Sequence, residues 1–133
     1  MVMVKMVEDG NAPPEVQAVF DEIKAARKTN WINNFWKVLA ASPQTMKRIW
    51  TSVKLVMTPG ALDALTKEMI YIAVSVTNNC PYCIHSHTAA ARAKGMTDEM
   101  YHELIAVVGL ANETNRLANG YQMPIDEEFI PVK

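Results

Sequence analysis

The eight residues at positions 80–87, CPYCIHSH, contain both cysteines of the chain and two of its three histidines. Cys80, Cys83 and His87 are separated by three and four residues, so on a helix neighbouring members of this set share one face. Cysteines at this spacing in a first helical turn can reach the α-carbon separation of a disulfide, roughly 4.4–6.8 Å. The N–H groups and dipole of a helix start favour a thiolate, and a nearby imidazole favours it further. The cluster therefore suits dithiol–disulfide chemistry.

Redox chemistry at sulfur also requires a group that moves protons, and Glu68 is the candidate. It lies three residues after Leu65 and four before Ile72, beside an apolar stripe, so we expect it to be partly buried. A carboxylate in such a place can orient an imidazole and exchange protons with it. Along two antiparallel helices, Glu68 lies about 18 Å before Cys80 and His87 lies about 10 Å into the next helix. A contact between them therefore requires a crossing angle or a bent junction.

Two other uses of this cluster compete with redox chemistry. Its two thiols, together with one imidazole and the carboxylate, are all ligand types that zinc accepts, which would suit a zinc-stabilised oligomeric binding module. Structural zinc sites usually combine two separate pairs of ligands, however, and the sequence has no second Cys/His pair. Free cysteines also pack as small hydrophobic residues. We favour the redox interpretation, and we expect neither a metal nor a cofactor.

The composition is that of an ordinary globular protein. The chain has 133 residues, 50% of them hydrophobic and 20% charged, with a formal net charge of −1. This length fits a single domain over residues 1–133. No basic run suggests nucleic-acid binding, and no apolar stretch is long enough to cross a membrane. The N-terminus lacks the apolar region of a secretory signal, so we expect a cytoplasmic protein with neither a nucleic-acid nor a membrane partner.

Helical patterning dominates the sequence, and we expect an all-α fold of about six helices with no strand. The first helix is expected within 13–28, where prolines suit the first turn, and a short second helix within 33–42. A third helix follows, with Ser42 as its N-cap and Pro43 at its first position. The apolar positions of the first and third helices are Val16, Val19, Phe20, Ile23, Met46, Ile49, Trp50 and Val53.

Segment 61–79 decides whether the second half is helical too. Its β-branched and aromatic residues are typical of a strand, but its apolar residues step by three and four, which favours a long buried helix. Those residues are Leu62, Leu65, Met69, Ile72 and Val76. The next helix is expected from Cys80 or Pro81 to a C-terminal cap at Gly95, and Thr97 then caps a final long helix. Residues 119–133 are predicted to form a tail.

The spacing around the cysteines resembles a known family signature. Glu68, eleven further residues and then C-x-x-C-x-x-x-H is similar to the signature of the carboxymuconolactone decarboxylase/AhpD-like alkylhydroperoxidase superfamily. The segment KEMIYIAVSVTNNCPYCIHSHTAAARAKGMTDE resembles the core of that family throughout. The likeness extends upstream to NNFWKVLAASPQTMKRIW and downstream into the last helix, so it covers most of the chain.

This resemblance implies an all-α homo-oligomer, a trimer or a hexamer, with its site near a subunit interface. It also implies a cysteine pair that cycles between dithiol and disulfide without a metal. By position, Cys83 is the sulfur that is oxidised to a sulfenic acid, whereas Cys80 donates a proton and closes the disulfide. The same resemblance assigns the proton relay to Glu68 and His87.

The chain departs from the AhpD pattern at one relay position. The AhpD pattern has a histidine between the two cysteines, whereas this sequence has Tyr82, so Tyr82 and the additional His85 are auxiliary candidates. The order of the cysteines has two interpretations. Helix-start electrostatics alone favour Cys80 as the thiolate, whereas the resemblance and the four-residue step to His87 favour Cys83. We take Cys83 as the attacking sulfur.

We therefore predict a thiol-dependent peroxidase or disulfide oxidoreductase of the alkylhydroperoxidase type. Its substrate would be a hydroperoxide or a disulfide on a partner protein, and an external dithiol would restore the reduced pair. The superfamily name also suggests lactone decarboxylation. The decarboxylase branch does not depend on a CxxC pair, so the two cysteines argue against that activity here.

Overall fold

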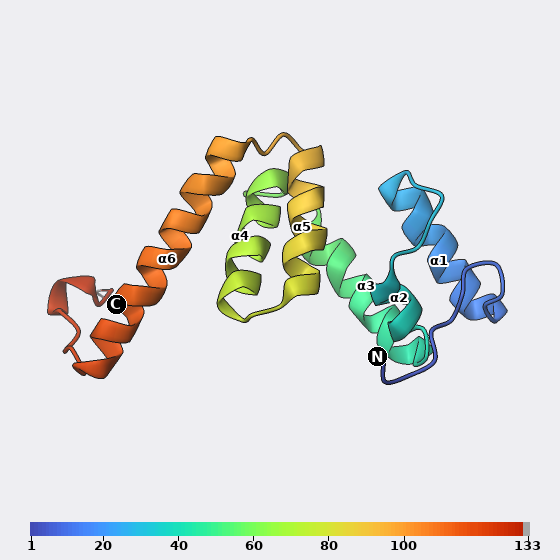
Figure 1. Ribbon diagram of the computed structural model, residues 1–133, viewed down its shortest axis with the longest axis horizontal. Helices are drawn as coiled ribbons and strands as arrows, with labels where there is room; N and C mark the ends of the chain where they lie inside the picture. Colours follow the sequence, from blue (N-terminus) through green and yellow to red (C-terminus); the bar gives the residue numbers. More distant parts are fainter. Residues whose placement is uncertain (132–133) are drawn as a thin grey trace. The chain divides into compact units, whose positions relative to one another are not determined.

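The computed structural model describes residues 1–131, which form six α-helices, one short 3₁₀ helix and no strand (Figure 1). The helices are α1 (Pro14–Arg27), α2 (Asn34–Leu39), α3 (Pro43–Met57), α4 (Ala64–Thr77), α5 (Pro81–Ala93), α6 (Asp98–Gly120) and η1 (Glu127–Phe129). The expected all-α fold of about six helices is confirmed. The chain divides into two compact units, Met1–Thr58 and the part from Pro59 onward. The single domain expected over residues 1–133 stays a prediction.

The first unit is held together by a large apolar core between α1, α2 and α3. All four apolar positions predicted for α1 are buried, and the rings of Trp36 and Trp50 meet edge to face with centroids 5.6 Å apart. The buried residues of this core are Val16, Val19, Phe20, Ile23, Ile32, Trp36, Ala40, Met46 and Trp50. Ser42 is the N-cap of α3 as expected, but its hydroxyl bonds the Thr45 hydroxyl at 2.9 Å and caps no backbone N–H.

In the second unit, α4 is a helix and not a strand, as its apolar spacing predicted. Asp63 caps its start by accepting a hydrogen bond from the Thr66 N–H at 2.7 Å. Leu62 lies before the helix and is exposed, so its expected place in the buried stripe is wrong and the stripe begins at Leu65. Ile72 forms a small buried core with Ala91 of α5 and Met96.

The turn from α4 into α5 is short and tightly bonded. After the helix cap at Asn78, Asn79 adopts a left-handed backbone conformation with φ of 54°, which asparagine tolerates better than most residues. The N–H groups of Asn79 and Cys80 then donate to the carbonyls of Val76 and Ser75 at 3.2 and 3.0 Å. This pattern is a Schellman motif. Cys80 therefore has two roles, because its N–H closes the end of α4 and the same residue is the N-cap of α5.

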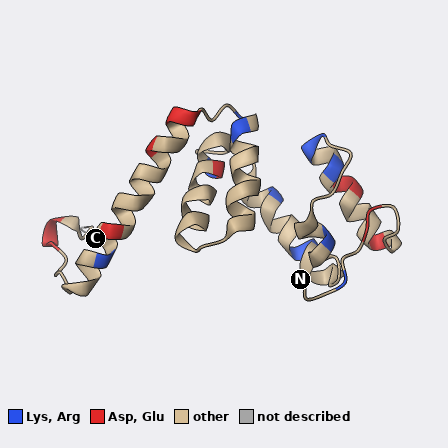
Figure 2. Ribbon diagram, in the orientation of Figure 1, with Lys and Arg blue, Asp and Glu red and all other residues tan. Residues whose placement is uncertain are grey.

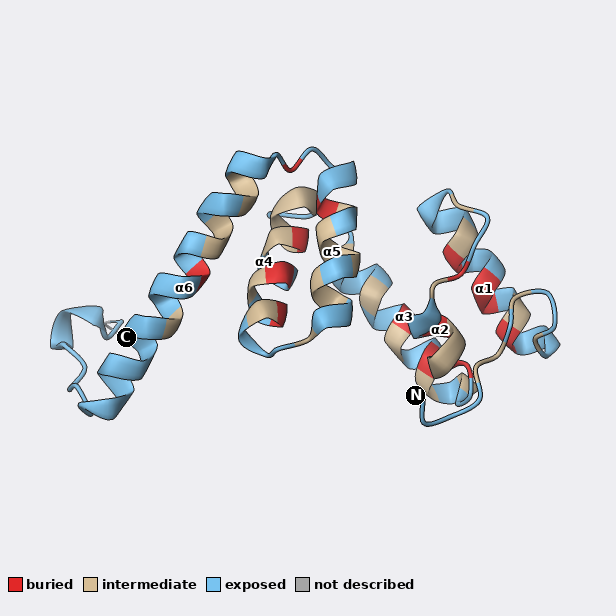
Figure 3. Cartoon of the chain, in the orientation of Figure 1, coloured by how far each residue is buried: buried red, intermediate tan, exposed pale blue. Residues whose placement is uncertain are grey.

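The far end of α5 closes in the same way. The helix ends at Ala93, and Gly95 takes a left-handed conformation with φ of 101°, so the predicted glycine cap is confirmed. Thr97 caps α6 by accepting from the Met100 N–H at 3.2 Å, also as predicted. Along α6, Val108 is the buried residue, and most of the remaining helix is exposed (Figure 3).

No helix within residues 1–131 combines the length and apolarity needed to span a lipid bilayer. Acidic and basic side chains are spread over several elements, and α4 and α5 are mostly uncharged (Figure 2). The cytoplasmic location stays a prediction.

Candidate active site

The packing of α4 against α5 brings Glu68 and His87 into direct contact. The Nδ1 atom of His87 lies 2.6 Å from Oε2 of Glu68. Glu68 is nine residues before Thr77, the end of α4, and His87 is six residues after Pro81, the start of α5. Measured from the helix ends, their offset along antiparallel axes is only about 4.5 Å, which two side chains can span. The tight turn therefore removes the need for a bent junction.

Glu68 and Ser75 are the two buried polar residues of α4, and Glu68 has 7% of its surface exposed. Burial raises the pKa of its carboxyl group, but the hydrogen bond and charge of His87 and the charge of Lys94 lower it more. Its Oε1 atom lies 3.4 Å from Nζ of Lys94. The net pKa is below 4.5, so the carboxylate is ionised near neutral pH.

An ionised carboxylate only accepts hydrogen bonds, and this fixes the roles of the two imidazole nitrogens. The Nδ1–H of His87 donates to Glu68, which leaves Nε2 as the atom that exchanges a proton. Tyr71 holds the same ring from another side. The rings of Tyr71 and His87 are stacked, with centroids 3.6 Å apart and planes 19° from parallel. The imidazole is thus positioned by one hydrogen bond and one aromatic face.

Both cysteines are free thiols, at the N-cap and in the first turn of α5. Hydrogen bonds from the thiol and the backbone N–H of Cys83 lower the pKa of Cys80, and they outweigh the opposing effect of burial. Burial raises the pKa of Cys83 to about 11, helped by its hydrogen bond to Cys80 and by the charge there. Of the two thiols, Cys80 is therefore the more acidic. This order agrees with the helix-start argument, and the assignment of Cys83 as the attacking sulfur stays a prediction.

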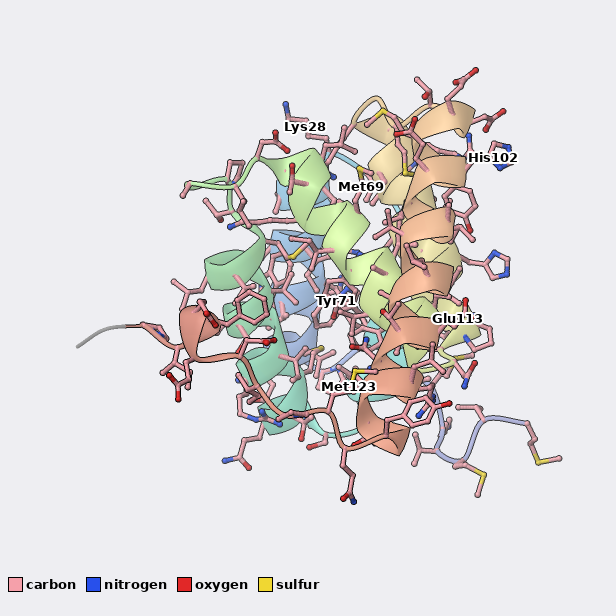
Figure 4. All side chains as sticks on the ribbon, turned by 90° about the vertical axis from the view of Figure 1, so that its left-hand side faces the viewer. Lys28, Met69, Tyr71, His102, Glu113 and Met123 are labelled. Atoms are coloured by element: carbon pink, nitrogen blue, oxygen red, sulfur yellow. The ribbon has the colours of Figure 1, made fainter. Side chains whose placement is uncertain are left out.

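The auxiliary candidates occupy exposed positions on α5. Tyr82 and His85 are both exposed. His102 on α6 projects away from the helices (Figure 4). In the same described range, no three His, Cys, Asp or Glu side chains are arranged to hold a metal ion.

Sequence reasoning missed two residues that touch the relay, Tyr71 and Lys94. Tyr71 follows Glu68 by three residues on α4, and Lys94 follows His87 by seven residues at the end of α5. Both spacings place the side chain near the relay face of its helix, which is the signal that could have identified them. Figure 4 marks Tyr71 on α4, together with its neighbour Met69.

The comparisons with known proteins cover the whole site. Residues 43–124 match the carboxymuconolactone decarboxylase family. A crystal structure of the alkylhydroperoxidase AhpD core from Rhodospirillum rubrum is 51% identical, with a TM-score of 0.95, and the match covers 99% of each chain.

Two curated relatives also match, and both are uncharacterised proteins. Protein 4 in the cox locus of Paracoccus denitrificans is 44% identical over 54 residues, which is 41% of this chain and 49% of the relative. A protein of Cupriavidus necator is 30% identical over 81 residues, 61% of this chain and 72% of the relative. The chain thus spans about half the length of the first relative. From the family match and the AhpD core structure together, this chain belongs to the carboxymuconolactone decarboxylase family.

Proposed function

We propose that this protein is a dithiol oxidoreductase that reduces hydroperoxides, with Cys80 and Cys83 as its redox pair. The observation that supports this most strongly is the position of two free cysteines at the N-cap and in the first turn of α5, three residues apart. One of the two thiols is also more acidic than the other. Such a pair offers a reactive thiolate and a resolving thiol within one helical turn. The likeness to the AhpD core structure supports the same chemistry.

Cys80 is the more acidic of the two thiols, so it loses its proton first and Cys83 keeps its own. An attack by Cys83 therefore begins with transfer of its proton to the Cys80 thiolate. His87 takes up and returns protons through Nε2, and the Glu68 carboxylate stabilises the imidazolium that forms. The role of the Glu68–His87 pair is to move protons so that the negative charge can pass from one sulfur to the other within the site.

The oxidation step then follows simple sulfur chemistry. The Cys83 thiolate attacks the terminal peroxide oxygen, an S–O bond forms and the O–O bond breaks. Sulfur is oxidised to a sulfenic acid and the peroxide is reduced to an alcohol. The Cys80 thiol attacks this sulfur, water leaves, and the disulfide forms. An external dithiol reduces the disulfide by exchange, and a disulfide on a partner protein could replace the peroxide as oxidant.

The second unit also supports a homo-oligomeric assembly, the trimer or hexamer that the resemblance implies. Ile70 and Val74 are one turn apart on α4 and both are exposed, and Val107 and Leu110 form a similar exposed pair on α6. Apolar faces of this kind are typical of surfaces covered in an assembly. Light scattering after size-exclusion chromatography measures the assembly directly. A monomer at micromolar concentration would contradict it.

The function is tested by peroxide consumption with a dithiol donor, using the wild type, Cys80→Ser and Cys83→Ser. We expect turnover by the wild type and no turnover by either variant, and loss of two thiols per chain when the wild type is oxidised without the donor. In Cys80→Ser, a sulfenic acid trapped on Cys83 would assign the attack to that sulfur. Full activity in Cys83→Ser would show that this assignment is wrong. A wild type that keeps both thiols in excess peroxide would defeat the proposal.

A further inference from the structure

We propose that Tyr71 is a further catalytic residue of this site, and that its hydroxyl protonates the oxygen that leaves when a cysteine thiolate attacks a hydroperoxide. This inference rests on the proposed function, because it concerns the same peroxide step. It adds a residue from α4 that is neither part of the cysteine motif nor part of the Glu68–His87 hydrogen bond.

The position of Tyr71 is fixed by its neighbours. Its ring stacks on the His87 imidazole with centroids 3.6 Å apart, and it follows Glu68 by three residues on the same helix. The residue is 39% exposed, so part of it remains open to solvent while its ring packs against the imidazole. A substrate that reaches the imidazole can therefore reach the phenol as well.

The sulfurs act on this phenol electrostatically. Burial raises the pKa of Tyr71, and the charges of Cys83, Cys80 and Glu68 raise it further. The geometric link to the sulfurs is His87, on which Tyr71 stacks and which follows Cys83 by four residues, about one turn, on α5. Because these charges disfavour a phenolate, Tyr71 stays a neutral O–H donor beside an anionic sulfur. A neutral donor suits a site where a thiolate must remain ionised while a new anion forms.

The proton balance of the step shows why such a donor is useful. Attack of the thiolate on the terminal oxygen of an alkyl hydroperoxide forms the S–O bond and releases an alkoxide. An alkoxide is far more basic than a phenolate, so the Tyr71 proton moves to it as the O–O bond breaks. The products are a sulfenic acid, an alcohol and a transient phenolate. The phenolate regains its proton from the solvent that reaches this half-exposed ring.

The test uses two oxidants that differ in their need for a proton. tert-Butyl hydroperoxide releases an alkoxide, whereas peracetic acid releases acetate, which leaves without protonation. The reduced protein is mixed with each oxidant in a stopped-flow instrument, and a single turnover is followed. Tyr71→Phe keeps the ring that stacks on His87 and removes only the hydroxyl. Tyr121→Phe makes the same change at a residue that is 75% exposed after α6.

We expect Tyr71→Phe to slow the reaction with tert-butyl hydroperoxide roughly a hundredfold and the reaction with peracetic acid less than about twofold. Tyr121→Phe should match the wild type with both oxidants. Equal slowing with both oxidants would show a purely structural role for Tyr71, and unchanged rates with both would show no role. Either result would overturn this inference while leaving the proposed function intact. A wild type inert to both oxidants would overturn the proposed function, and the inference would fall with it.

Discussion

The two units of the chain bury different kinds of residue. The first unit has nine buried hydrophobic residues in one cluster, whereas the cluster in the second unit has three, Ile72, Ala91 and Met96. The second unit instead buries Glu68 and Ser75 on the same helix as Ile72. Positions that an ordinary amphipathic helix would fill with apolar side chains are thus given to polar groups. The unit with the smaller apolar core is thus the one that contains the candidate active site.

The largest effect is expected in the apolar core of the first unit. Phe20→Ala removes a ring that is 0% exposed and should lower the free energy of unfolding by about 3–5 kcal/mol. Phe129→Ala makes the same change at a ring that is 77% exposed and should cost less than about 0.5 kcal/mol. Urea unfolding followed by circular dichroism measures both. Similar losses in the two variants would remove the basis of the comparison.

The next largest effect concerns the buried carboxylate of the second unit. Glu68→Gln removes the charge that holds the His87 Nδ1–H and stabilises its imidazolium, so peroxide turnover should fall roughly a hundredfold. Glu113→Gln removes an exposed charge on α6 and is the matched control, with turnover expected to stay at the wild-type value (Figure 4). Wild-type turnover in Glu68→Gln would show that Glu68 is a structural residue only.

The two cysteines should differ in their rate of alkylation by several-fold. The pKa of Cys80 lies below 9.0 and that of Cys83 is about 11, so limiting iodoacetamide should label Cys80 first near neutral pH. Peptide mapping by mass spectrometry gives the ratio. The pH midpoint for Cys80 labelling should lie below 9.0. Preferential labelling of Cys83 would restore the order expected from the family resemblance.

A smaller effect is expected from the ion pair of Glu68 with Lys94. The folded pKa of Glu68 is lowered, so its stabilising effect is fully present above about pH 4.5 and is lost as the pH falls through the folded value. Lys94→Met removes a charge that lowers this pKa, so the acid loss of thermal stability should begin at a higher pH. The exposed Lys5→Met is the control. An unchanged pH profile in Lys94→Met would contradict the coupling.

The smallest effect is expected at His85. Its side chain is exposed on α5, away from the relay contact, so His85→Ala should change turnover by less than about twofold. His87→Ala, in contrast, removes the partner of Glu68 and should behave like Glu68→Gln. Steady-state turnover of the two variants separates them. A large loss in His85→Ala would make this histidine a working part of the site.

The sequence was sufficient to predict the helices and to select Glu68 and His87, which the structure brings into contact. Apolar spacing identified α4 as a helix despite its strand-like residues, and the caps at Thr97 and Gly95 were predicted because capping depends on local chemistry. Leu62 was misplaced because Asp63 is the N-cap and the helix begins at Ala64, two residues after Leu62. Helix ends are set by a single cap, whereas periodicity only indicates a range of residues.

The contacts between elements could not be predicted in the same way. The Tyr71–His87 stack and the Lys94–Glu68 ion pair depend on how α4 and α5 pack, which no local pattern specifies. For the contact between Glu68 and His87, the separation of the two residues along the helix axes was overestimated. The Schellman turn at Asn79 shortens the connection between the helices. The position of Cys80 at the helix start indicated its greater acidity, whereas the burial that raises the pKa of Cys83 could not be predicted from spacing.

The central claim is that Cys80 and Cys83 form a redox pair served by the buried relay. One equivalent of tert-butyl hydroperoxide added to the reduced protein, followed by intact-mass analysis and peptide mapping, tests it directly. We expect loss of two hydrogens per chain and a single disulfide that joins Cys80 to Cys83. Two unmodified thiols after this treatment, or an oxidised product without that disulfide, would contradict it.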